Sequence, residues 1–150
     1  MGANVSRAQA SFRIGATIVT NPRGALPNAR AITAQLGIEP SHVHEPGERR
    51  SARAGPYKHG QWSLESPLAE GEELEAHLRW LLERLLPVRA GIGEIVKADP
   101  RLHADFFCGL YLKDANERLV LSPQTLEGIG ALNADLDLDI YWEGDDGPAG

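Results

Sequence analysis

The chain has 150 residues, of which 42% are hydrophobic and 24% are charged, and a formal net charge of -6 at pH 7. This length suits one globular domain, and the acidic balance argues against a nucleic-acid binder, which usually presents a basic face. The single cysteine, Cys108, excludes an intramolecular disulfide and a cysteine-rich zinc site. No apolar run approaches the ~20 residues that span a bilayer, and residues 1–10 lack the apolar core of a secretory signal. We therefore expect a soluble, reduced, cytoplasmic domain without a membrane segment.

The first half of the chain predicts three strands and one helix. Residues 1–10 read as a loose lead-in, and the apolar alternation from Phe12 to Ile18 predicts a half-buried strand. A helix opening at Pro27 or Asn28 should end at Gly37, because glycine accepts the left-handed conformation after a helix. Between residues 42 and 60 we expect mostly loop with one short strand. Residues 61–65 predict a strand with Trp62 as a core anchor.

The second half begins with the strongest helical pattern. One apolar stripe predicts the helix, formed by Leu74, Leu78, Leu81, Leu82 and Leu85. Pro87 should kink or restart this helix, which continues to about Lys97. Alternation predicts a long strand at 102–112 that ends in a hairpin turn and a short strand at 118–121.

Ser122 and Pro123 then predict the start of a helix, with Ser122 as its N-cap. Its expected buried stripe is Leu126, Ile129 and Leu132. A last strand follows, in which Leu136, Leu138, Ile140 and Trp142 alternate with Asp135, Asp137, Asp139 and Tyr141.

These elements predict a single α+β domain at 11–142, followed by a disordered acidic tail at 143–150. We expect two layers, with helices on one face of a mostly antiparallel sheet. The first six elements have the ferredoxin-like order β-α-β-β-α-β, and an additional β-α-β return follows.

Several segments of the chain together resemble one known family. They read ITAQLGIEPSHVHEPGE at 32–48, YKHGQWSLES at 57–66, LVLSPQTLEGIGAL at 119–132 and LDLDIY at 136–141. In order and spacing they are similar to the mainly bacterial family catalogued as domain of unknown function 4279. The resemblance implies a fold and brings no established activity or catalytic residue.

The most distinctive candidate site is a basic loop in an otherwise acidic chain. Its candidate ligand- or partner-binding residues are Arg49, Arg50, Arg53, Tyr57, Lys58 and His59. The loop can hold a phosphate, a nucleic-acid backbone or an acidic partner. It can equally pair internally with Asp135, Asp137 and Asp139, or only solubilise the loop.

Other polar groups predict no metal, cofactor or catalytic residue. The three aspartates of the last strand alternate at about 6.5–7 Å, too far apart for a shared calcium ion, so we interpret them as a solvated face. The next interpretation is electrostatic pairing with basic residues on a neighbouring strand. His42 and His44 need further ligands to bind zinc, and we interpret them as exposed loop histidines. Cys108 lies on an apolar strand face and should be a buried, inert thiol.

The leading functional hypothesis is a non-catalytic protein-interaction domain that uses its sheet face and basic loop. An immunity-like or regulatory role would be one form of it, by analogy only. One alternative is binding of an anion or nucleic acid through the basic loop. Another is a small hydrolase-like enzyme with Glu48 or Asp105 beside a histidine. No property of the sequence defines the oligomeric state.

Overall fold

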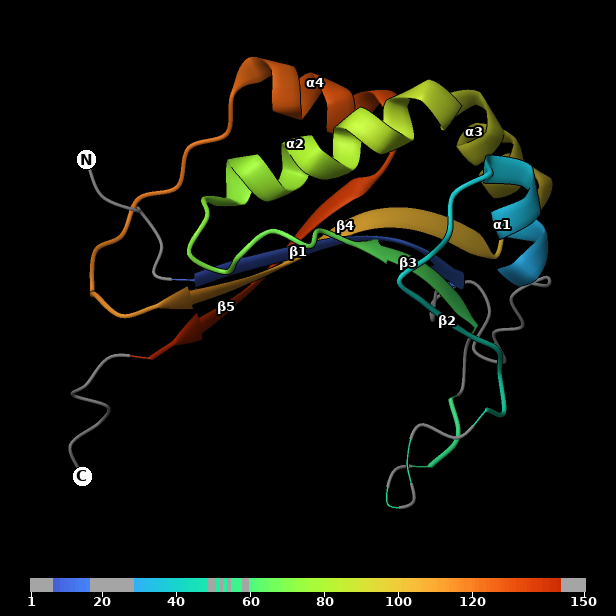
Figure 1. Cartoon of the computed structure of the whole chain (residues 1–150), viewed down its shortest axis with the longest axis horizontal. Helices are drawn as coiled ribbons and strands as arrows, with labels where there is room; N and C mark the ends of the chain where they lie inside the picture. Colours follow the sequence, from blue (N-terminus) through green and yellow to red (C-terminus); the bar gives the residue numbers. More distant parts are fainter. Residues whose placement is uncertain are drawn as a thin grey trace.

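One five-stranded sheet, with strand order β2-β3-β1-β4-β5, carries the helices of the domain on a single side (Figure 1). The computed structural model describes residues 7–16, 29–48, 51, 53, 55–57 and 60–143. The strands are β1 (Arg7–Ala16), β2 (His42–His44), β3 (Gln61–Glu65), β4 (Leu102–Leu112) and β5 (Asp135–Trp142). The helices are α1 (Ala29–Leu36), α2 (Leu74–Leu85), the 3-10 helix η1 (Leu86–Val88), α3 (Arg89–Ala98) and α4 (Pro123–Ala131). No helix in these described ranges is long and apolar enough to cross a membrane.

The sheet is antiparallel except at one edge. β1 pairs antiparallel with both β3 and β4, and β2 pairs antiparallel with β3. β5 pairs parallel with β4 after the chain returns through α4. The predicted α+β class and single helix-covered sheet are confirmed, but the predicted order of elements is not confirmed in full.

The difference lies between β4 and α4, where residues 118–121 form no strand. β4 already has β1 on one edge and β5 on the other, so a hairpin strand has no edge of β4 to pair with. The loop is instead held by Glu117, whose Oε2 accepts hydrogen bonds from the backbone N–H groups of Lys113 at 2.6 Å and Asp114 at 2.9 Å. Local alternation predicted a strand that the sheet cannot accommodate.

The core lies between the sheet and the helices. Phe12 of β1 contacts Phe106 of β4 and Trp62 of β3, with ring centroids 5.2 Å and 6.5 Å away. All three rings are fully buried, which confirms Trp62 as a core residue, and its Nε1 donates to Thr33 Oγ1 at 3.0 Å. The whole predicted leucine stripe of α2 is buried above them.

Two boundaries differ from or refine the prediction. β1 begins at Arg7, not at Ser11, and buries Ala8 and Ala10, so residues 7–10 belong to the domain and not to a loose lead-in. Pro87 lies in η1, where the chain restarts as α3. Gly37 follows α1 with φ +68°, as the prediction of a glycine stop requires.

α4 begins as predicted, because Ser122 Oγ accepts a hydrogen bond from Thr125 N at 3.2 Å. Its predicted buried stripe is only partly right. Ile129 and Leu132 are buried, whereas Leu126 is 51% exposed. The core therefore reaches one side of α4 and leaves Leu126 outside.

Candidate functional site

The helices cover one side of the sheet, and the opposite side is here called the open side (Figure 1). Arg13 of β1 and Asp105 of β4 form a charged pair on this open side. Arg13 donates from Nε and Nη2 to the two carboxylate oxygens of Asp105 at 2.8 Å and 2.6 Å. The guanidinium lies 4.3 Å from the ring centroid of Phe107, and Asp137 approaches its Nη2 at 3.9 Å. The hydrogen bond with Asp105 raises the pKa of Arg13 above its usual value. Both oxygens of the buried Asp105 carboxylate accept hydrogen bonds from Arg13, so the pair links β1 to β4 on the open side of the sheet.

An aromatic cluster occupies the β2 edge of the same side. The rings of His44 and Tyr57 stack with centroids 3.4 Å apart and planes 5° apart. His42 Nε2 lies 3.1 Å from His44 Nδ1 and 3.5 Å from the Tyr57 hydroxyl. Both histidines lie in the strand β2 and not in a loop, so that part of the prediction is wrong. His42 is exposed as expected, whereas His44 is buried. No group of three or more metal-ligating side chains occurs in the described part of the chain.

The structure places two of the six candidate residues of the basic loop. Tyr57 belongs to the aromatic cluster, and Arg53 is exposed. Arg49, Arg50, Lys58 and His59 lie outside the described residues.

For Asp137, one of the three aspartates expected as alternative partners of the basic loop, the structure gives a basic neighbour in Arg13 of β1, 3.9 Å away. β2, which leads into the loop, and β5 are at opposite edges of the sheet, with three strands between them. The sequence pattern had no means of placing Arg13 next to this aspartate.

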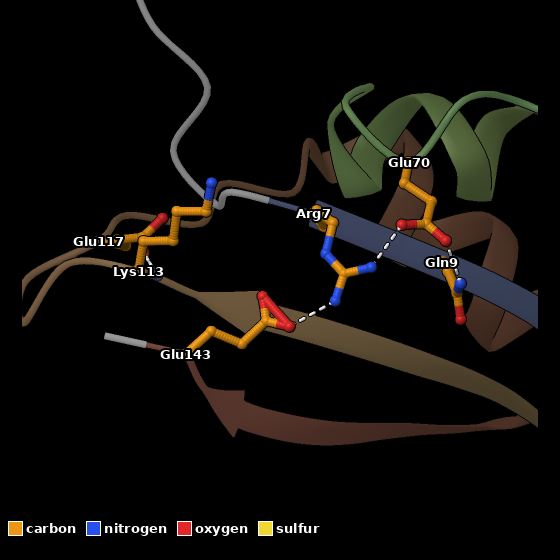
Figure 2. Close-up of polar contacts among 6 residues, drawn as sticks. All are labelled: Arg7, Gln9, Glu70, Lys113, Glu117 and Glu143. Carbon is orange, nitrogen blue, oxygen red and sulfur yellow. Dashed lines mark hydrogen bonds and ion pairs between the residues drawn. The ribbon is translucent and has the colours of Figure 1, made fainter. Parts of the chain in front are cut away.

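A polar cluster ties the start of β1 to the segment before α2 and to the end of β5 (Figure 2). Arg7 donates to Glu70 at 2.7 Å and also hydrogen-bonds Glu143, while Gln9 donates to the other oxygen of Glu70 at 2.6 Å. These hydrogen bonds lower the pKa of Glu70, with Arg7 as the main cause. The Arg7 guanidinium also lies 4.2 Å from the ring centroid of Tyr111. These contacts give Arg7 a structural role, because it links β1 to the segment before α2 and to the residue after β5.

A polar cleft of about 360 Å³ lies where the pairing of β1 with β3 ends. Beyond that point the segment 66–70 flanks β1, with Ser66 N donating to Ala10 O and Ala8 N to Glu70 O. His77 of α2 lines the cleft and is 1% exposed; its Nδ1 is 2.9 Å from Ser66 Oγ, and burial lowers its pKa. The other lining residues are Gln9, Ala10, Ser11, Glu65, Ser66, Leu68, Glu70, Phe107 and Gly109.

The outer edge strand β5 presents the largest exposed apolar side chains. Its register with β4 places Leu138, Ile140 and Trp142 on the helix side, opposite Cys108, Leu110 and Leu112. They are nevertheless 37%, 56% and 51% exposed, and we name these three residues the β5 apolar strip. Alternating apolar residues in a strand usually mark a buried face, but here the helices do not cover it.

Cys108 is fully buried in β4, as predicted from its apolar face. Burial raises the pKa of its thiol to about 12. A nucleophilic cysteine needs an accessible thiolate near neutral pH, so Cys108 is not suited to covalent catalysis.

One family model, described as Domain of unknown function (DUF4279), matches residues 23–143. The chain belongs to this family. The match extends from the segment before α1 to the end of β5, so it spans most of the DUF4279 domain seen here. No curated protein and no solved structure is significantly similar to the chain.

Sequence reasoning missed the β5 apolar strip and the open-side pair of Arg13 and Asp105 within this DUF4279 domain. The alternation of β5 is visible in the sequence, but such a pattern predicts that the apolar side is buried, whereas here it is exposed. Arg13 was visible only as a polar position in an alternating strand. Both features depend on which strands become neighbours.

Proposed function

We propose that this domain is a non-catalytic protein-interaction domain and that β5 with its apolar strip is the surface that binds the partner. The observation that carries the proposal is the clustering of exposed apolar side chains. In the described part of the chain, every exposed large hydrophobic residue lies between residues 120 and 142, namely Val120, Leu126, Leu138, Ile140, Tyr141 and Trp142. Four of these six residues, Leu138, Ile140, Tyr141 and Trp142, lie on the single strand β5. Exposed apolar surface concentrated on one element is typical of a protein-binding face.

The aromatic content of β5 supports the same proposal. Tyr141 stacks on Tyr111 of β4 with ring centroids 5.1 Å apart, and both rings lie on the open side of the sheet. Trp142 lies on the opposite side of the strand and is half exposed. Tyrosine and tryptophan are enriched in the energetic centres of interfaces, so both sides of β5 offer contacts that a partner can use.

Comparative co-purification from the source cells tests this function. We expect a partner to be recovered with the wild-type domain and lost with the variant Ile140→Ser/Trp142→Ser. Val120→Ser/Leu126→Ser is the matched control, because these residues are 54% and 51% exposed but lie outside β5. Recovery of the same partner with all three proteins would contradict the proposal.

A second candidate function is anion binding at the basic loop, favoured by the exposed Arg53 beside the segment that carries Tyr57. Tyr57 belongs to the same loop, and its hydroxyl lies 3.5 Å from Nε2 of His42, a second group that can form hydrogen bonds. Titration with inorganic phosphate and with heparin at low salt tests it. Binding should weaken steeply with salt and disappear in Arg49→Ala/Arg50→Ala/Arg53→Ala; absence of binding to either anion would refute it.

A further inference from the structure

β5 has an unpaired outer edge. It is the last strand in the sheet order, and its inner edge is taken by β4 along its whole length, from Asp135 to Trp142. No backbone hydrogen bond from its outer edge occurs in the described ranges. An edge strand of 8 residues presents a row of unpaired N–H and C=O groups, which is a template for one more strand.

The two sides of β5 differ in chemistry. The helix side carries the β5 apolar strip, and the open side carries Asp135, Asp137 and Asp139. Asp139 accepts a hydrogen bond from the Tyr141 hydroxyl at 2.5 Å, and Asp137 is 3.9 Å from Arg13. Asp135 and Asp137 are exposed, so the edge as a whole is acidic on one side and apolar on the other.

The aspartates disfavour a second copy of the chain on this edge. Two copies could pair their β5 strands antiparallel, edge to edge, about a two-fold axis, so that the two open sides form one continuous surface. Open-side residues of one β5 strand would then lie directly opposite open-side residues of the other. Aspartates of one copy would then oppose aspartates of the other, and like charges directly opposite are destabilising in a sheet. The chain's own segment 143–150, EGDDGPAG, carries the same charge and is also a poor complement.

A strand with the opposite charge pattern complements both sides of this edge. Lysine or arginine at alternate positions would face the three aspartates, and apolar residues between them would cover the β5 apolar strip. The backbone of the added strand would supply the missing hydrogen bonds of the edge. This mode of recognition takes affinity from the main chain and specificity from the alternate side chains.

We propose that the partner of this domain binds as an extended segment, with alternating basic and apolar residues, that adds a strand to the outer edge of β5. The inference deepens the proposed function, since it names the chemistry of the partner at the same surface. The proposed function leaves the conformation and charge of the partner open. The inference specifies that the partner binds as a strand and that this strand is positively charged.

A labelled synthetic peptide tests the inference directly. The probe has 8 residues, the length of β5, with lysine and valine alternating. Its binding to the full chain is measured by fluorescence anisotropy at low and moderate salt, and hydrogen exchange of the β5 amides is measured with and without the peptide. We expect saturable binding, slower exchange in β5 and weaker binding as salt increases.

Two control peptides separate strand addition from simple charge attraction. One has the same composition with all lysines before all valines, and the other replaces lysine by glutamate. We expect both to bind at least tenfold more weakly than the alternating basic peptide. Equal binding of the block peptide would overturn strand addition, and equal binding of the glutamate peptide would overturn the charge of the partner.

Charge variants of the domain locate the contact. In Asp135→Asn/Asp137→Asn/Asp139→Asn we expect binding of the alternating peptide to weaken about tenfold, because three cross-strand charge pairs are lost. The matched control is Glu39→Gln/Glu83→Gln/Asp114→Asn, which removes the same charge from exposed positions outside β5. Equal weakening in both variants would show that only net charge matters and would overturn the inference.

Remaining outcomes distinguish the inference from the proposed function. If no peptide binds a chain that is folded by circular dichroism, the aspartates act only as a guard against edge pairing and the inference fails. If sedimentation shows that the wild type is a dimer and that the Ile140→Lys variant is a monomer, a second copy covers β5 and the inference fails. If deletion of residues 144–150 makes exchange in β5 faster, the chain covers its own edge and the inference fails. In the first of these cases a partner lost from Ile140→Ser/Trp142→Ser in co-purification would still support the proposed function.

Discussion

Arg13 and Asp105 are directly opposite each other on β1 and β4 and are joined by two hydrogen bonds on the open side of the sheet. The Asp105 side chain is 6% exposed, so removal of Arg13 would leave a buried carboxylate without its main counter-charge. We predict that Arg13→Leu lowers the free energy of unfolding by about 2–3 kcal/mol. This is below the range for a fully buried pair, because the Arg13 side chain is 27% exposed. Urea denaturation measures the change.

The double variant Arg13→Leu/Asp105→Leu is the control for that prediction. It removes both charges and should be more stable than Arg13→Leu alone, since an apolar pair can replace an ion pair at little cost. A single variant as stable as the wild type would show that water or His103, whose Nε2 is 4.0 Å from Asp105, compensates the charge.

His77 should make stability depend on pH in one direction. Burial lowers its pKa in the folded chain below the ordinary value, so the unfolded chain binds the proton more readily. The stabilising contribution is therefore complete above the unfolded pKa of about 6.5 and is lost as pH falls toward the lower, folded value, at no more than ~1.4 kcal/mol per pH unit. When the pH is lowered from about 7.5 to about 5, the free energy of unfolding should fall less for His77→Leu than for the wild type, as measured by urea denaturation. An unchanged loss would exclude His77 as a source of acid sensitivity.

The N-cap of α4, Ser122, should contribute measurably to the stability of the folded chain. Ser122→Ala removes the oxygen that accepts the hydrogen bond from Thr125 N, and we expect a loss of about 1 kcal/mol in the free energy of unfolding. Ser122→Asp keeps an acceptor at this position and should lose much less. If both variants lose the same amount, the effect comes from another contact of the Ser122 side chain, such as the hydrogen bond that its hydroxyl donates to Thr125 Oγ1 at 3.2 Å.

Cys108 should be unreactive in the folded chain. Its thiol is fully buried and burial raises its pKa to about 12, so at pH 8 almost no thiolate is accessible. A colorimetric disulfide reagent should react with the chain only in denaturant. The chain has 1 cysteine, so all reaction reports this residue. Fast reaction without denaturant would mean that β4 opens readily.

Two glycines of α4 should respond differently to alanine. A Cβ on Gly130 meets no atom within 4 Å, whereas one on Gly128 comes within 2.9 Å of Leu82 Cδ1 in the packing of α4 on α2. Alanine adds up to ~1 kcal/mol of helix propensity at either position. We expect Gly130→Ala to be more stable than Gly128→Ala by thermal denaturation. The reverse order would show that Leu82 moves aside without cost.

Local patterns in the sequence predicted the elements that depend on local physics. The leucine stripe of α2 is buried because its spacing matches the helical turn, and Gly37 and Ser122 end and begin helices through backbone conformation and a single hydrogen bond. Trp62 was recognisable as a core residue because it shares one side of an alternating strand with Leu64, and both are buried. The family was also recognisable, since its segments recur in order along the chain.

Only the tertiary structure decided which segments become neighbours. The alternation at 118–121 predicted a strand, yet both edges of β4 are occupied, so no strand forms. The sequence predicts a loop at His42 and His44, whereas pairing with β3 makes this segment a strand and His44 stacks on Tyr57.

The sequence by itself determined an α+β domain with one helix-covered sheet, and it determined that β5 alternates between aspartate and apolar residues. The tertiary structure decided that β5 is an edge strand whose apolar side the helices leave uncovered. Periodicity reports which side chains share a face, because it follows from the geometry of one strand. Whether another layer covers that face depends on contacts between distant segments, which no local pattern contains.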